Sequence, residues 1–201
     1  MRHWHVSLLS FCCFFMFLFL FLFLLTPYDE ISASRTSSFD LINKTCTTCS
    51  HKSIVFNYTF CLASLLEIPA SHMTNLQGLA IVATELALRD ATRTLSVIKG
   101  LLRNETSGRR QMKTACLRDC DLLYSDGVVT LVDSVGAFLE GRYGDAGAWV
   151  TAVMEGTTTC EEGFRDVDEA SPLTERNYSL FQLCDVALCI MNLLGSDVLS
   201  F

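Results

Sequence analysis

The segment from Ala115 to Phe164 constrains the fold more than any other part of the chain. Apolar residues recur there every three or four positions on both sides of Gly141-Arg142-Tyr143-Gly144, as the buried face of a helix requires. The glycines favour a turn between the two periodic stretches. Cys120 and Cys160 lie on opposite sides of that turn. A bond between them would staple two antiparallel helices, and the chain-entropy model assigns about 4 kcal/mol to a loop of about forty residues.

Two further segments show the same periodicity. One begins after Thr74 or Asn75, either of which can cap a helix, and the other begins at Ser171 and Pro172 and ends at Gly195. Glycine followed by three threonines at 156–159 predicts a bend or a tightening in the helix that contains it. Four long periodic segments without strand alternation predict an all-α fold, namely an up-down-up-down four-helix bundle.

Residues 34–70 predict a small N-terminal helical hairpin. Ser38 is the expected N-cap of its first helix, and Pro69 ends its second. A bond between Cys46 and Cys61 would close a loop of about sixteen residues and contribute about 3 kcal/mol. We expect this hairpin and the bundle of residues 71–201 to form one domain.

Residues 1–33 are typical of a secretory signal peptide. Arg2 and two histidines precede a long apolar run, and Ala33 supplies a small residue for cleavage. The run is also long enough to span a bilayer, so an uncleaved anchor is the alternative. Cys12 and Cys13 lie inside it, which leaves eight of the ten cysteines in the mature chain.

The mature chain is acidic. Without residues 1–33 it has 14 basic and 20 acidic residues, a net charge of −6. The sequence therefore offers no basic stripe to bind nucleic acid, and no membrane partner is expected after signal cleavage. A basic partner is favoured instead, with binding that weakens at high salt.

Four N-x-Ser/Thr triplets are compatible with secretion and with N-glycosylation, although each is equally compatible with an ordinary surface asparagine. They begin at Asn43, Asn57, Asn104 and Asn177. Asn104 is the favoured acceptor because it lies in a polar stretch.

The residue types that carry catalysis are sparse. The mature chain has two histidines, His51 and His72, and both fall in predicted loops without a nucleophile motif. Cys46 and Cys49 form a CxxC without the second pair that a zinc site needs. The acidic cluster at 161–169 lacks the ligand alternation of a calcium loop. We therefore expect no enzyme, no metal and no cofactor.

Several motifs together resemble the plant invertase and pectin methylesterase inhibitor family. They are Leu117-Arg118-Asp119-Cys120, Leu123-Tyr124-Ser125-Asp126, Thr157-Thr158-Thr159-Cys160-Glu161, the Cys46 and Cys61 segments, and Ser171-Pro172-Leu173-Thr174. The resemblance implies a four-helix bundle with an N-terminal helical hairpin. It also implies disulfides from Cys46 to Cys61 and from Cys120 to Cys160. The family pattern assigns no partner to Cys49, Cys116, Cys184 and Cys189. The sequence is compatible both with buried thiols at these positions and with an additional disulfide among them.

The resemblance also implies a function. Family members bind pectin methylesterase or a cell-wall or vacuolar invertase one to one, which places this chain in the apoplast or the vacuole. Invertase inhibitors carry Pro-Lys-Phe where this chain has Gly141-Arg142-Tyr143, so Arg142 and Tyr143 are the expected target contacts. Because the chain stops soon after the domain, we expect an inhibitor and not the pro-region of an esterase. The alternative is a secreted helical lipid carrier, whose adjacent cysteines are missing here.

Overall fold

The computed structural model describes residues 16, 18, 29–104 and 111–198. The chain divides into two compact units, Met1–Ser37 and Ser38–Phe201. Most of the predicted signal peptide, residues 1–33, lies outside the described residues. The second unit is all-helical over its described residues, which confirms the predicted fold class.

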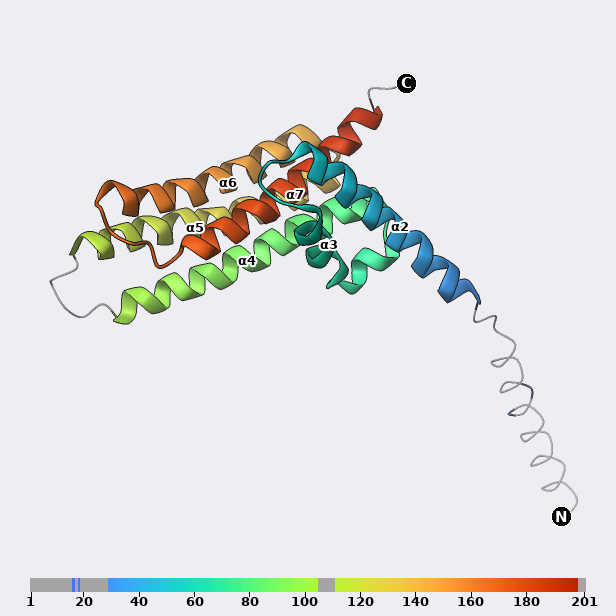
Figure 1. Ribbon diagram of the computed structural model, residues 1–201, viewed down its shortest axis with the longest axis horizontal. Helices are drawn as coiled ribbons and strands as arrows, with labels where there is room; N and C mark the ends of the chain where they lie inside the picture. The colour runs from blue at the N-terminus through green and yellow to red at the C-terminus, as the bar shows by residue number, and fades with distance from the viewer. Residues whose placement is uncertain (1–15, 17, 19–28, 105–110, 199–201) are drawn as a thin grey trace, which may run out of the picture. The chain divides into compact units, whose positions relative to one another are not determined.

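Four long helices make the bundle in Figure 1: α4 (Leu76–Asn104), α5 (Gln111–Leu139), α6 (Tyr143–Asp166) and α7 (Thr174–Val198). Each packs against two others in the cyclic order α4, α5, α6, α7. The core between them is apolar. Its fully buried side chains include Leu79, Ile98, Leu117, Leu131, Val150, Phe164, Leu180 and Ile190.

Of the two predicted caps of bundle helices, one agrees with the structure and one is displaced. The Asn75 side chain accepts a hydrogen bond from the Gly78 N–H at 3.0 Å, so Asn75 caps α4. The Ser171 hydroxyl accepts from the Leu173 N–H at 3.1 Å, just before α7 begins at Thr174. Asn75 thus supplies an acceptor to the first turn of α4, whereas Ser171 bonds a residue that precedes α7 and is not its N-cap.

Two helix ends differ from the sequence-based prediction. The first helix of the N-terminal hairpin, α2 (Asp29–Lys52), contains Ser38 in its interior, so Ser38 is not its N-cap. α6 is continuous through residues 156–159, where Thr157 and Thr159 donate to the carbonyls of Met154 and Glu155. α7 continues past Gly195 to Val198.

The N-terminal hairpin precedes the bundle in the sequence. It consists of α2, α3 (Tyr58–Leu66) and the 3₁₀ helix η1 (Pro69–Met73). Asn57 caps α3 by accepting from the Phe60 N–H at 2.9 Å. The buried residues of the hairpin belong to the same core as those of the bundle. They are Ile42, Cys46, Cys49, Phe56, Cys61 and Leu65.

α5 and the Thr174–Gly195 part of α7 are long and apolar enough to cross a membrane by length and hydropathy alone. The core helix of a globular protein passes the same test, and both helices bury side chains in the bundle core. Length and hydropathy therefore do not by themselves make either helix a membrane span.

Candidate functional site

The turn between α5 and α6 has a defined backbone geometry. Gly141 has a φ of 78°, the left-handed conformation that glycine adopts without steric cost. The Arg142 N–H donates to the Ala137 carbonyl at 2.9 Å, and the Gly141 N–H donates to the Phe138 carbonyl at 3.0 Å. This pair of bonds is a Schellman motif, which ends α5 and fixes where residue 142 leaves the helix.

Arg142 is held at the tip of the turn by its neighbours. Its guanidinium donates to Glu140 at 2.9 Å and to Asp145 at 2.7 Å, and it lies 5.6 Å from the centre of the Trp149 ring. Hydrogen bonds to Asp145 and Glu140 raise the pKa of Arg142, which keeps it cationic. Its side chain is still 45% exposed. The residue is therefore both oriented and accessible.

Tyr143 is half-buried beside it and has structural contacts of its own. Its ring centre lies 4.9 Å from that of Phe138, and its hydroxyl accepts from the Gln77 side chain of α4 at 3.2 Å. Tyr143 also lines a surface hollow of about 570 Å³, together with Lys52, Asp185 and the Cys49–Cys189 pair. The turn thus borders a concave surface.

Two disulfides match the pairs that the family resemblance implies. Cys120 on α5 is bonded to Cys160 on α6, with an S–S distance of 2.11 Å. Within the same hairpin, the buried Ser134 hydroxyl donates to the Ala146 carbonyl at 2.9 Å. In the N-terminal hairpin, Cys46 is bonded to Cys61 at 2.02 Å.

A third disulfide joins Cys49 to Cys189, 140 positions apart, and ties α2 to α7. Sequence reasoning left it open, and the only hint was that both residues lie on stretches with helical periodicity. The CxxC cysteines therefore pair outward, with Cys61 and Cys189, and not with each other. Cys116 and Cys184 are buried free thiols, and no group of residues in the described ranges is arranged to hold a metal ion.

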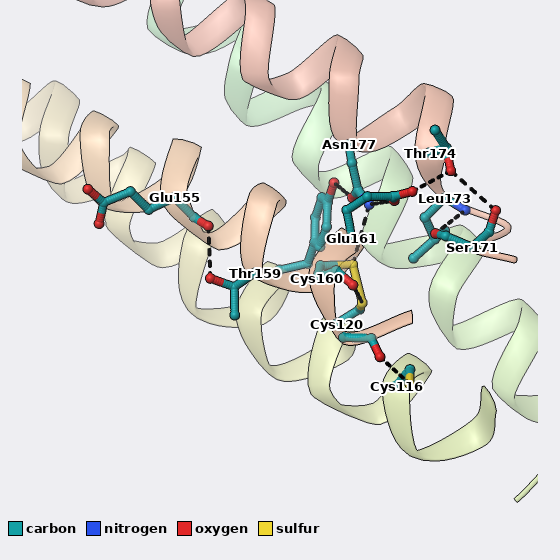
Figure 2. Close-up of a disulfide and its surroundings, with 12 residues drawn as sticks. Cys116, Cys120, Glu155, Thr159, Cys160, Glu161, Ser171, Leu173, Thr174 and Asn177 are labelled. Atoms are coloured by element: carbon teal, nitrogen blue, oxygen red, sulfur yellow. Dashed lines mark hydrogen bonds between the residues drawn. A yellow bond between two sulfur atoms is a disulfide. The ribbon is translucent and has the colours of Figure 1, made fainter. Parts of the chain in front are cut away.

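Asn177 is the centre of a buried polar contact next to the Cys120–Cys160 bond. Figure 2 shows it directed from α7 toward Glu161 of α6, to which its Nδ2 donates at 2.7 Å. Its Oδ1 accepts from the Tyr124 hydroxyl at 2.8 Å. Thr174 donates to the other oxygen of Glu161. These bonds connect α5, α6 and α7 from the buried Tyr124 to the exposed Thr174.

Comparison with known families decides what this helical, cross-linked chain is. The family model described as plant invertase/pectin methylesterase inhibitor matches residues 40–190. The chain belongs to this family. The plant invertase/pectin methylesterase inhibitor family consists of inhibitor proteins and not of enzymes, which confirms the resemblance and the non-enzymatic reading of the sequence. Plant proteins of this family are typically extracellular.

Individual family members show the same similarity. A Platanus orientalis protein named "Putative invertase inhibitor" is 31% identical over 160 residues, which cover 79% of this chain and 92% of that protein. A pectinesterase inhibitor of Actinidia deliciosa is 27% identical over 139 residues, 69% of this chain and 74% of that protein. Among solved structures, mutant form A of a pectin methylesterase inhibitor from Arabidopsis has the same fold, with a TM-score of 0.63 at 24% identity over 75% of this chain and 96% of that one.

The predicted glycan acceptors differ in accessibility within this inhibitor-family fold. Asn57 and Asn104 are exposed, and Asn43 is half-buried with its Oδ1 bonded to the Tyr58 hydroxyl. Asn177 is only 4% exposed and its Nδ2 is already bonded to Glu161. Asn177 is therefore the least accessible of the four predicted acceptors.

Proposed function

We propose that this protein is a secreted inhibitor that binds a plant carbohydrate enzyme, acid invertase or pectin methylesterase, in a 1:1 complex and blocks its site. The observation that carries this proposal is the turn at residues 141–143. It presents a cationic and an aromatic side chain on a backbone fixed by two hydrogen bonds, in a chain of the inhibitor family. A fixed turn loses little conformational entropy when it docks.

Acid invertase is the first candidate for the target. Glycoside hydrolases act through a pair of carboxylates, and a guanidinium is complementary to such a pair in charge and geometry. Arg142 uses three of its N–H groups on Glu140 and Asp145, which leaves two for a partner. The Platanus relatives, 31% and 30% identical, carry the invertase inhibitor name.

Pectin methylesterase is the second candidate. Relatives from Actinidia deliciosa and Arabidopsis thaliana, 27% and 26% identical, are named pectinesterase inhibitors. The hollow beside Tyr143 has the size of a small-molecule site, so it can accept a side chain of either enzyme. For the location, we propose the apoplast or cell wall, with the vacuole as alternative, and glycans on Asn57 and Asn104.

Inhibition assays on both enzymes test the proposal. The unmodified protein should inhibit one of them. The Arg142→Ala/Tyr143→Ala variant should inhibit it with an inhibition constant at least about tenfold higher, the loss typical of central interface residues. Arg165→Ala is the matched control, because Arg165 is an exposed α6 arginine with an i,i+3 carboxylate partner, Glu162. Melting curves verify that each variant is folded. Undiminished inhibition by the folded double variant would remove the turn from the interface.

A further inference from the structure

The solvent face of α5 carries an unusual row of apolar side chains. Leu122, Val129, Val132 and Leu139 are 64%, 60%, 54% and 68% exposed. We call these four residues the α5 apolar row. Burying them would remove a large apolar area from water, which is the usual driving force of association.

The spacing of the row matches a helix-packing seam. Its members are separated by seven, three and seven positions, the a/d pattern of heptads that keeps side chains on one face. The bundle core uses another face of α5, because Leu117, Tyr124, Leu131 and Phe138 are buried. At 1.5 Å per residue, the row extends for about 26 Å, which is long enough for a partner helix or strand.

An acidic row runs beside the apolar one. Asp119, Asp126, Asp133 and Glu140 recur every seven residues, and all four are exposed. In each of the pairs Leu122/Asp126 and Val129/Asp133 the carboxylate lies four positions after the apolar residue, and is therefore its neighbour on the helix surface. A second copy docked antiparallel on this face would bring acidic rows together, whereas a partner with lysines and arginines would complement them.

The two rows lead directly into the turn. Leu139 and Glu140 are the residues before Gly141, and Glu140 accepts the hydrogen bond from Arg142. The α5 face and the tip of the turn are thus one continuous surface. A partner that contacts Arg142 can extend along α5 without crossing a gap.

We infer that the α5 apolar row and the acidic row form a docking surface for a segment of the target enzyme that carries aliphatic side chains flanked by lysine or arginine. This inference rests on the proposed inhibitory function and specifies where most of the apolar contact is made. The turn supplies the group that enters the enzyme site, and α5 supplies the area that a stable complex needs.

Polar substitutions on α5 test the inference, with inhibition of the two candidate enzymes as the readout. Val129→Gln/Val132→Gln retains helix propensity on an exposed face and should raise the inhibition constant at least tenfold. Met73→Gln, at another exposed apolar residue, in η1, should leave it within twofold. Asp126→Lys should raise the constant and reduce its salt dependence, whereas Glu155→Lys, the same change on the exposed surface of α6, should do neither.

The outcomes separate this inference from the function on which it rests. If the unmodified protein inhibits an enzyme and both α5 variants inhibit it equally well, the docking surface is wrong and the function stands. If the unmodified protein inhibits neither enzyme, the function itself is wrong. Self-association in sedimentation experiments that Val129→Gln abolishes would assign the row to a second copy, and row-dependent binding to phosphatidylcholine vesicles would assign it to a membrane. Either result would overturn the inference.

Discussion

At the scale of single residues, Asp90 on α4 shows how strongly burial acts inside this bundle. Burial raises the pKa of its carboxyl above the ordinary 3.8, although Arg176, Arg93 and a hydrogen bond from Ser179 lower it. One of its oxygens is buried without a hydrogen-bond partner in the described part of the chain. The charged form is therefore less stable in the folded protein than in the unfolded one.

Replacing Asp90 with Asn should stabilise the protein at neutral pH. Because folding raises the pKa, the folded state holds the Asp90 proton more tightly than the unfolded chain does. Ionisation therefore costs stability as the pH rises through the window that begins near 3.8. Asn does not ionise, so its advantage should shrink as the pH falls toward about 4.

Thermal melting across this pH range measures the Asp90 effect, with the exposed Asp133→Asn as control. A variant that is less stable than the unmodified protein at neutral pH would show that the attraction to Arg176 and Arg93 outweighs burial.

At the scale of elements, α5 and α6 end in the same backbone geometry, but with different residues in the left-handed position. Gly141 takes the left-handed position after α5, and Asp168 takes it after α6, with a φ of 58°. The Glu169 N–H donates to the Phe164 carbonyl at 3.0 Å, and the Asp168 N–H donates to the Arg165 carbonyl at 3.1 Å. A side chain in this conformation costs about 1 kcal/mol, which glycine avoids.

Asp168→Gly should therefore raise the melting temperature by about 2 to 4 °C, the shift that about 1 kcal/mol causes in a domain of this size. Asp168→Ala removes the carboxylate but keeps the Cβ, so it separates the backbone effect from the loss of charge. Calorimetry in which both variants gain equally would attribute the effect to charge near the helix C-terminus.

Helices and their caps could be predicted from local sequence to different degrees. The bundle helices were predictable because their apolar faces repeat over many turns, and Asn75 was predictable because it directly precedes such a repeat. Ser38 also precedes a repeat, yet α2 begins nine residues earlier, at Asp29. A serine inside a helix and a serine at its start look alike in sequence unless the preceding residues break the helix.

At the scale of the whole molecule, the Cys49–Cys189 bond fastens the N-terminal hairpin to the bundle. Polar contacts also join the hairpin to α7: Ser53 donates to Asp185 at 2.5 Å, and Tyr178 and Gln182 donate to the Val55 carbonyl at 3.0 and 3.1 Å. The sequence could not reveal this bond, because a pairing across 140 positions depends on how α2 lies on α7.

Removing this bond should destabilise the fold. We expect Cys49→Ser/Cys189→Ser to lose about 2 to 5 kcal/mol in the free energy of unfolding, because the unfolded chain regains the freedom of a long loop. Urea denaturation measures the change, and Cys116→Ala, which removes a cysteine without removing a bond, is the control. An unchanged unfolding midpoint would mean that noncovalent contacts alone hold the hairpin.

The thiol count tests the disulfide framework independently. After signal removal, the mature protein should show no reactive thiol while folded and two after denaturation without reductant, from Cys116 and Cys184. Burial raises the pKa of Cys184, which adds to its inertness. Four thiols under denaturing conditions would mean that one of the three bonds does not form.

The candidate site was only partly predictable for a related reason. Arg142 and Tyr143 could be located from the glycines around them, because a turn between two periodic segments is a local feature. Their environment depends on residues outside the turn, such as Trp149 farther along α6 and Gln77 on α4. The same limit applies to Asn177, whose sequon suggests the surface while Tyr124 and Glu161 hold it in the core.

An activity titration tests the central claim most directly, that this stapled bundle blocks a carbohydrate enzyme through its α5–α6 turn. Increasing amounts of purified protein are added to acid invertase, and in parallel to pectin methylesterase, at enzyme concentrations well above the dissociation constant and at mildly acidic pH. We predict that the activity of one enzyme falls linearly to an end point at one inhibitor per enzyme. Full activity of both enzymes in the presence of a large excess of folded protein would contradict the account.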